Sequence, residues 1–169
     1  MILMFLTYFG QEAITLTLES TSTTIDWAMA EILRHPMCLH KLQQELDHLN
    51  NVSSKVDCQD LVNQSHLDEL PYLKAVVNET LRLHIPLPTL IPHKSTQSCQ
   101  VGGYNIPKDT CLFLNVWAIT RDHRIWVNPH EFMPERFLNE NNPIDVHVKN
   151  FEFLPFGVGR RGCPGYHLA

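Results

Sequence analysis

The stretch of sequence that decides the fold is Phe156-Gly157-Val158-Gly159-Arg160-Arg161-Gly162-Cys163-Pro164-Gly165. It places one cysteine in a glycine-rich loop, and the proline after it is suited to the first turn of a helix. Glycine allows backbone N–H groups to turn toward a sulfur atom, and a helix N-terminus with nearby arginines stabilises a thiolate. A lone Cys-Pro-Gly more often marks an ordinary turn with an unreactive cysteine. Both interpretations remain open on this loop alone.

The whole run matches the pattern Phe-x-x-Gly-x-Arg-x-Cys-x-Gly at every defined position, and this pattern resembles the haem-ligand signature of the cytochromes P450. Two further motifs follow the order of that family. Glu79-Thr80-Leu81-Arg82 resembles its Glu-x-x-Arg helix, and Pro134-Glu135-Arg136-Phe137 resembles its Pro-Glu-Arg-Phe segment. Residues 71–78 and 101–107 resemble the land-plant microsomal members, particularly those that act on terpenoids, alkaloids and phenylpropanoids. The resemblance extends over nearly all of residues 21–169.

This resemblance implies a mainly α fold with small β sheets, which is part of the cytochrome P450 fold from the distal helix to the haem-binding Cys loop. We expect one partial domain, residues 1–169. Its successive regions are the distal helix region (1–35), helices including the Glu-x-x-Arg helix (36–84), a β hairpin region (85–120), a meander (121–155), and the Cys loop with the start of the next helix (156–169). The 169 residues are few for a whole member of the family, so we expect a fragment.

Local patterns in the first half of the chain predict helices. Apolar spacing predicts a helix over about 11–34, which His35-Pro36 ends, and an amphipathic helix over 37–49. A short segment is expected near 60–63. Pro71 then predicts the start of a helix that reaches about His84.

Strands and turns are predicted after that helix. Gln100-Val101 and residues 104–106 flank Gly102-Gly103, which is typical of a hairpin with a glycine turn. Residues 111–115 are a second strand candidate. The prolines at 129, 134, 143 and 155 predict a meander without long elements.

Composition excludes several other classes of function. A formal net charge of −5 gives no electrostatic reason to expect nucleic acid as a partner. The apolar residues 1–9 are too few to span a bilayer and lack the basic flank of a signal peptide. Five cysteines without a C-x-x-C pair favour reduced thiols, and the ten histidines form no zinc-binding spacing.

Glu79 and Arg82 are three residues apart, so on a helix they share a face and can pair. Such pairs are commonly exposed and contribute only a few tenths of a kcal/mol. The resemblance implies instead a buried triad, in which Arg136 joins Glu79 and Arg82 and fixes the meander against the helix. The predicted role of the triad is structural, not catalytic.

The resemblance also implies how haem is bound. Cys163 is the expected axial ligand of the haem iron, within a cofactor-binding loop that includes Phe156, Gly157, Gly159 and Gly165. Arg161 is expected to bond one haem propionate. His93, after the proline-rich segment, is the second candidate, although a surface loop histidine is an equally good interpretation.

The distal helix departs from the family pattern. Residues 25–31 align with that helix, and counting back places Glu19 at its acid position and Ser20 at its threonine position, as the expected catalytic pair. Leu16 and Thr17 stand where the family has small residues that open a groove for dioxygen. A misread exon boundary within residues 1–18 would account for this departure equally well. The hydroxyl-rich run 20–24 is equally typical of a helix whose side chains bond to their own carbonyls.

By resemblance, the chain is expected to be part of a haem-thiolate monooxygenase that hydroxylates a small hydrophobic substrate of plant specialised metabolism. An NADPH-dependent flavoprotein reductase would supply the electrons. The expected location is the cytosolic face of the endoplasmic reticulum membrane, through an anchor missing from this chain, and residues 87–91 would line the substrate side. Two alternatives stay open. One is a reductase-independent haem-thiolate isomerase, which the ordinary length of the Cys loop disfavours, and the other is a truncated, non-functional fragment that does not retain haem.

Overall fold

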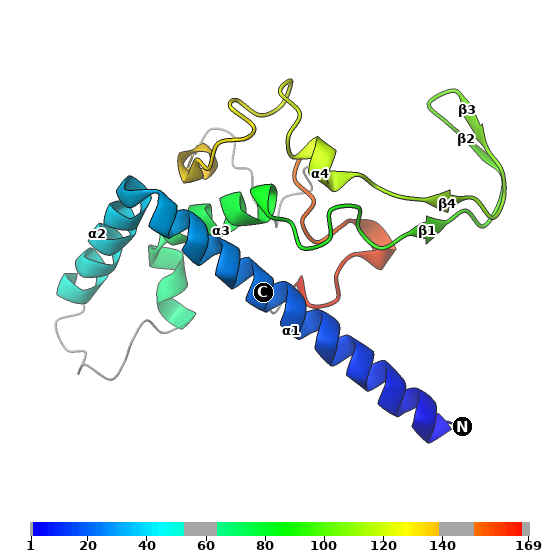
Figure 1. Ribbon diagram of the computed structural model, residues 1–169, viewed down its shortest axis with the longest axis horizontal. Helices are drawn as coiled ribbons and strands as arrows, with labels where there is room; N and C mark the ends of the chain where they lie inside the picture. The colour runs from blue at the N-terminus through cyan, green and yellow to red at the C-terminus, as the bar shows by residue number, and fades with distance from the viewer. Residues whose placement is uncertain (1, 53–63, 139–150, 167–169) are drawn as a thin grey trace.

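Three long helices form in the first half of the chain, two where the apolar spacing predicts them and one that starts at Pro71. The computed structural model describes residues 2–52, 64–138 and 151–166. Helix α1 (Ile2–Arg34) starts earlier than expected, α2 (Pro36–Val52) begins at the predicted proline, and α3 (Pro71–Leu83) ends with His84 as its C-cap (Figure 1). The prediction of a helical first half is therefore confirmed. The segment expected near 60–63 lies outside the described residues, and a 3₁₀ helix, η1 (Gln64–Glu69), follows it.

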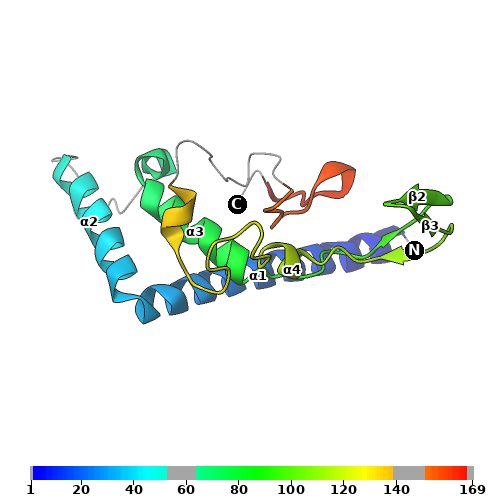
Figure 2. The same cartoon turned by 90° about the horizontal axis from the view of Figure 1, so that it is seen from above.

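Helices α1, α2 and α3 pack around one apolar cluster. In both views α1 and α2 form a corner that α3 lies beside (Figures 1 and 2). The buried members of this cluster are Ile32, Cys38, Leu42, Tyr72 and Val76. Fully burying an aliphatic or aromatic side chain contributes about 1.5–3 kcal/mol, so this cluster holds the three helices together.

The start of α3 is capped by a residue from another helix. Leu70 occupies the N-cap position but its side chain accepts no hydrogen bond. The carboxylate of Glu45 on α2 accepts instead from the backbone N–H groups of Tyr72, at 2.7 Å, and Leu73, at 3.0 Å. These N–H groups have no partner within the helix, so Glu45 satisfies two of its orphan donors.

The predicted hairpin is confirmed. Strand β2 (Cys99–Val101) pairs antiparallel with β3 (Tyr104–Ile106), and the turn between them places Gly102 at φ 56° and Gly103 at φ 84°. Two positive φ angles are what a tight two-residue hairpin turn requires, and glycine adopts them without steric cost.

A second small sheet joins β1 (His93–Lys94) to β4 (Cys111–Leu112), also antiparallel. Strand β4 is shorter than the predicted 111–115, which is a correction. The reason is that Asn115 instead caps the short helix α4 (Val116–Ile119), since its side-chain oxygen accepts from the N–H of Ala118 at 3.0 Å. The helix-dominated architecture with small antiparallel sheets matches the predicted fold class.

The described part of the meander contains no long element, as its prolines predict. Its residues 121–138 form turns and end in a 3₁₀ helix, η2 (Pro134–Phe137). A further 3₁₀ helix, η3 (Gly159–Arg161), lies in the Cys loop. The helix expected after Cys163 is only a turn as far as Tyr166, whose N–H donates to the carbonyl of Cys163 at 3.4 Å. None of the described helices is long and apolar enough to cross a bilayer.

Candidate functional site

The Cys loop folds back on itself through its own backbone. The N–H of Cys163 donates to the carbonyl of Phe156 at 2.8 Å, and the N–H of Gly162 donates to the carbonyl of Gly159 at 3.1 Å. Gly157 and Gly159 have φ angles of 70° and 77°, which a residue with a Cβ rarely adopts. The two glycines therefore allow the turns that bring the ends of the loop together.

The loop presents its cysteine at the surface. Cys163 is exposed, whereas Cys38 is buried in the helical cluster. A Cβ added to Gly165 would lie 3.8 Å from Cys163 Sγ, so a side chain there would stand beside the sulfur. The ring of Phe156 packs edge-on against Tyr166, with 5.5 Å between the ring centroids. It also packs against the buried cluster of Leu81, Trp126 and Phe153, which anchors the loop to the fold.

Glu79, Arg82 and Arg136 are brought together between α3 and the meander. Nε of Arg82 donates to Glu79 Oε2 at 2.7 Å and its Nη2 donates to Oε1 at 2.8 Å, while Nε of Arg136 donates to Oε1 at 3.2 Å. The side chains of Glu79 and Arg82 have no exposed surface. The exposed-pair interpretation of the i,i+3 spacing is thus contradicted.

Arg82 uses the rest of its donors on the meander. Its Nη1 donates to the carbonyls of Thr120 and Pro129, both at 2.7 Å, and its Nη2 also donates to the carbonyl of Glu131 at 3.1 Å. With the two bonds to Glu79, all five guanidinium donors have acceptors. Arg82 and Arg136 also lie over the Trp126 ring, at 5.2 and 5.9 Å from its centroid. This network joins α3 to the meander.

Glu135, in the motif beside Arg136, makes contacts that the sequence did not predict. It accepts hydrogen bonds from Lys41 Nζ at 2.6 Å and from the Tyr72 hydroxyl at 3.0 Å. Burial alone would raise the pKa of Glu135, but the bond from Lys41 holds that pKa below its usual value. Burial raises the pKa of the Tyr72 hydroxyl and that of the neighbouring Cys38 thiol. Glu135 therefore joins α2, α3 and η2 as an ionised acceptor.

Arg161 and His93 are both exposed. Arg161 lies in η3, two residues before Cys163, and His93 opens β1. Leu90, three residues before His93, links the two regions, since its Cδ1 lies 3.5 Å from the position that a Cβ on Gly157 would occupy. The Cys loop therefore contacts the segment that leads to His93.

Glu19 and Ser20 lie on α1, where Glu19 is exposed and Ser20 is partly buried. Two neighbouring hydroxyls bond back along the helix: Ser22 donates to the carbonyl of Leu18 at 2.8 Å, and Thr24 to the carbonyl of Ser20 at 2.8 Å. The Cys loop, drawn red, stands apart from α1 in Figure 2. The predicted proton-relay positions and the cysteine are thus carried by separate elements.

The residues present fit a haem with a cysteine ligand. A thiolate is a soft donor that haem iron accepts as axial ligand, and the Cys loop offers one exposed sulfur with glycines on both sides. Arg161 is an exposed cation near that sulfur in sequence, as a propionate partner would be. Within the described residues, no three His, Cys, Asp or Glu side chains gather into a metal site of another kind.

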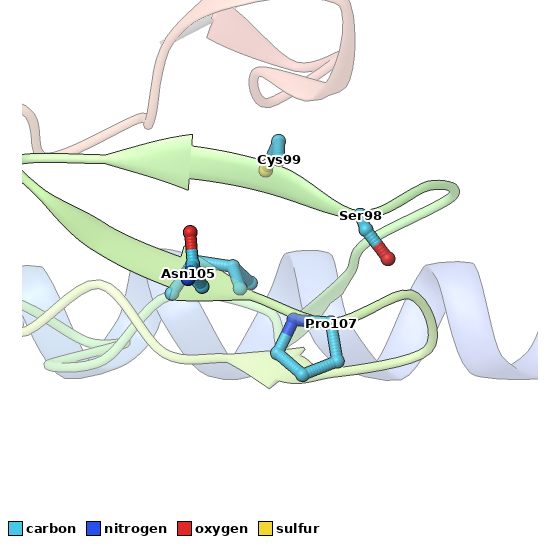
Figure 3. A pocket seen from close by; sticks show the side chains of 5 residues that line it. Ser98, Cys99, Asn105 and Pro107 are labelled. Carbon is cyan, nitrogen blue, oxygen red and sulfur yellow. The ribbon is translucent and has the colours of Figure 1, made fainter.

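The hairpin carries a shallow open depression that belongs to a different part of the fold. Its lining is shown in Figure 3 and consists of Ser98, Cys99, Asn105, Ile106 and Pro107. None of the predicted site residues contributes to it, so the depression is no candidate for the haem site.

Comparisons with known proteins identify the family of the chain. The sequence model of the family described as Cytochrome P450 matches residues 14–169. Cytochrome P450 98A1 of Sorghum bicolor is 45% identical over 157 residues, which are 93% of this chain and 29% of that protein. Flavonoid 3'-monooxygenase of Arabidopsis thaliana is 45% identical over 152 residues, 89% of this chain and 28% of that protein.

A solved structure is similar as well. A zebra fish cytochrome P450 with progesterone superposes with a TM-score of 0.78 at 37% identity, over 93% of this chain and 34% of the zebra fish chain. The chain thus spans about three-tenths of the length of the curated relatives above. With the Cys loop, the Glu79 network and the family match in agreement, the chain belongs to the cytochrome P450 family.

Proposed function

We propose that the protein acts as a haem-thiolate monooxygenase that hydroxylates a small hydrophobic substrate. The observation that carries this proposal is the exposed Cys163 in a loop closed by its bond to Phe156 and turned by Gly157 and Gly159. A relative named as a monooxygenase supports the reaction class.

The residues of this chain would bind and orient the cofactor. Cys163 would supply the axial thiolate, the loop glycines would let haem approach the backbone, and Arg161 and His93 would pair with its propionates. When bound, a haem with a thiolate ligand supplies dioxygen activation, because the electron-rich sulfur favours O–O cleavage. Glu19 and Ser20 would pass protons toward the oxygen side.

The substrate side is proposed to lie along residues 87–91. Leu87 and Ile91 are exposed there, while Leu90 is partly buried against the cluster of Ile85, Val116 and Leu154. An apolar lining of this kind suits an apolar substrate, and the zebra fish relative was solved with progesterone.

Electrons would come from an NADPH-dependent flavoprotein reductase. The proposed location is the endoplasmic reticulum membrane, facing the cytosol, where this reductase could reach the Cys loop. Both proposals rest on the resemblance to the land-plant microsomal members of the family. The assay with added reductase tests the electron donor, and fractionation of the host cell tests the location.

The test uses the full-length protein produced with a haem precursor. We expect a red-shifted Soret band for the ferrous carbonyl complex, and NADPH-dependent hydroxylation of an apolar substrate once the reductase is added. Turnover of a hydroperoxide without reductase would assign an isomerase instead. Purified protein that holds no haem would overturn the proposal.

A further inference from the structure

A second polar cluster lies between α1 and α3, separate from the Cys loop and from the Glu79 network. At its centre is Glu31 of α1, which is 6% exposed. His84 Nε2 donates to Glu31 Oε1 at 2.8 Å, and Trp27 stacks on the same imidazole with 4.0 Å between the ring centroids and 5° between the ring planes. A buried carboxylate is stable only when it is paired. The imidazole is therefore held by a hydrogen bond at its edge and by an indole on its face.

Two further side chains, those of His35 and Arg121, donate hydrogen bonds to backbone carbonyls of α1 and α3 near this cluster. His35 donates from Nδ1 to the carbonyl of Glu31 at 2.8 Å, and the same atom lies 3.4 Å from Glu31 Oε2. The Arg121 guanidinium donates to the carbonyl of Leu83 and lies over the Trp117 ring, 4.5 Å from its centroid. The end of α3 is thereby fixed from the side of α1 and from the side of α4.

The segment that follows His84 runs from the Glu31–His84 cluster to the Cys loop. Ile85 is buried against Val116 and Leu154, and the carbonyl of Pro88 accepts from the N–H of Trp117 at 3.0 Å. Leu90 follows with φ 52°, and its Cδ1 lies 3.5 Å from the point that a Cβ would occupy if Gly157 had one. Residues 85–91 are thus held at one end by His84 and at the other by contact with the Cys loop.

We propose that the Glu31–His84 hydrogen bond, braced by Trp27, is a positioning contact that sets the placement of residues 85–91 relative to α1 and the Cys loop. This inference rests on the proposed function, because that segment is the proposed substrate lining. Glu31 and His84 touch neither substrate nor cofactor and act through the segment. A shift of the imidazole would move Ile85, and with it the apolar side chains that orient the substrate.

The first test is hydrogen exchange and needs no turnover. The variants are His84→Ala, which removes the donor, and His84→Gln, whose amide can still donate to Glu31. His40→Ala, an exposed histidine on α2, is the matched control. We expect amide exchange within residues 85–91 to rise about fivefold in His84→Ala and to stay near the wild-type rate in His84→Gln and in the control. Exchange at the wild-type rate in His84→Ala would overturn the proposal.

The second test is substrate use by the haem-loaded protein. We expect His84→Ala and Glu31→Ala to raise KM and to lower product per NADPH about fivefold, with the double variant no worse than either single one. Should either alanine variant fail to fold, Glu31→Gln and His84→Gln are compared under the same assay, and near-normal KM is expected because both keep the hydrogen bond. Normal KM and coupling in folded alanine variants, with only a lower melting temperature, would show a purely stabilising contact.

The two proposals fail in different ways. A wild-type protein without the thiolate spectrum contradicts the monooxygenase, and the exchange rates still decide whether Glu31 and His84 position residues 85–91. A normal wild-type enzyme with unchanged exchange in His84→Ala contradicts the positioning contact alone.

Discussion

Glu79 and Arg82 face each other one helical turn apart on α3, joined by two hydrogen bonds of 2.7 and 2.8 Å, with no solvent reaching either side chain. Charged side chains that are removed from water in this way are stable only when each is paired with an opposite charge or a hydrogen-bond partner. Arg136 and the carbonyls of the meander complete this pairing. The pair is therefore a point at which helix and meander depend on each other.

Glu79→Ala or Arg82→Ala should yield little soluble haem-loaded protein. Breaking a buried ion pair costs roughly 3–5 kcal/mol, because the remaining partner stays buried without its counter-charge. Arg82→Lys should also fail, since an ammonium cannot supply five donors in the same plane. The measurements are haem content and melting temperature after purification.

Arg124→Ala is the matched control for that experiment, because Arg124 pairs with Asp122 at the surface. It should leave haem content and melting temperature close to those of the wild type. Well-folded Glu79 or Arg82 variants with normal haem content and no turnover would show that the network has a chemical role instead.

Cys163→Ser should abolish the red-shifted Soret band of the ferrous carbonyl complex, because serine offers no soft thiolate donor. The measurement is the difference spectrum of the full-length protein. Serine at each of the other four cysteines should leave the band intact, namely at Cys38, Cys58, Cys99 and Cys111. Survival of the band in Cys163→Ser would remove Cys163 as the ligand.

Ser20→Ala should lower the amount of product formed per NADPH, with hydrogen peroxide released in its place. Cleavage of the O–O bond needs a delivered proton, and without the hydroxyl the reduced oxygen leaves as peroxide. Ser22→Ala is the control, since the Ser22 hydroxyl donates to the carbonyl of Leu18. An unchanged product-to-NADPH ratio in Ser20→Ala would mean either that the alignment of the distal helix is shifted or that residues 1–18 are not the native distal helix.

Replacing Leu16 with Ala and Thr17 with Gly should raise turnover if these two side chains fill the dioxygen groove of the family pattern. The measurement is the rate of product formation at limiting and saturating oxygen. A rate above that of the wild type at limiting oxygen alone would support a blocked groove. Rates equal to those of the wild type at both oxygen concentrations would argue against it.

The Lys41–Glu135–Tyr72 contacts should make stability depend on pH in one direction. The pKa of Glu135 in the folded protein lies below its value in the unfolded chain, so its contribution is present above the unfolded pKa. That contribution is lost as the pH falls through the folded pKa. Glu135→Gln should lower the free energy of unfolding near neutral pH by up to about 1 kcal/mol, since the pair is partly exposed.

Urea unfolding at several pH values measures this effect. The gap between wild type and Glu135→Gln should narrow as the pH falls below about 4.3, the ordinary pKa of a glutamate, and should close only below the lower pKa of Glu135 in the folded protein. Asp68→Asn, which removes the exposed Lys74 pair, serves as the comparison and should change stability less. A gap that stays constant down to low pH would show that the charge of Glu135 does not matter.

Features set by neighbours in sequence were predictable. The hairpin turn follows from two adjacent glycines, the start of α2 from Pro36, and the Glu79–Arg82 pair from its spacing of three. Each depends on a few residues that are close along the chain. Strand β4 was predicted too long because an asparagine that suits a strand end also suits a helix cap.

Contacts between distant segments were beyond local patterns. The carbonyl acceptors of Arg82 lie 38 to 49 residues after it, and Glu31 meets His84 across 53 residues. A carbonyl carries no residue-specific signal, and a glutamate on a helix usually faces water. Only the family resemblance placed Arg136 beside Glu79, and nothing local pointed to Glu135 as an acceptor for Lys41.

The Glu45 cap has a consequence for the order in which the chain assembles. Helix α3 has 13 residues, a length at which an isolated helix is marginal in water, and its cap stands 27 residues before Tyr72. A peptide of residues 71–83 alone should therefore show little helicity by circular dichroism, and residues 36–83 considerably more. During synthesis, α2 and α3 can dock as soon as both have left the ribosome. The hydrogen bond from Arg82 Nη2 to the carbonyl of Glu131 can form only later, because Glu131 lies 49 residues after Arg82.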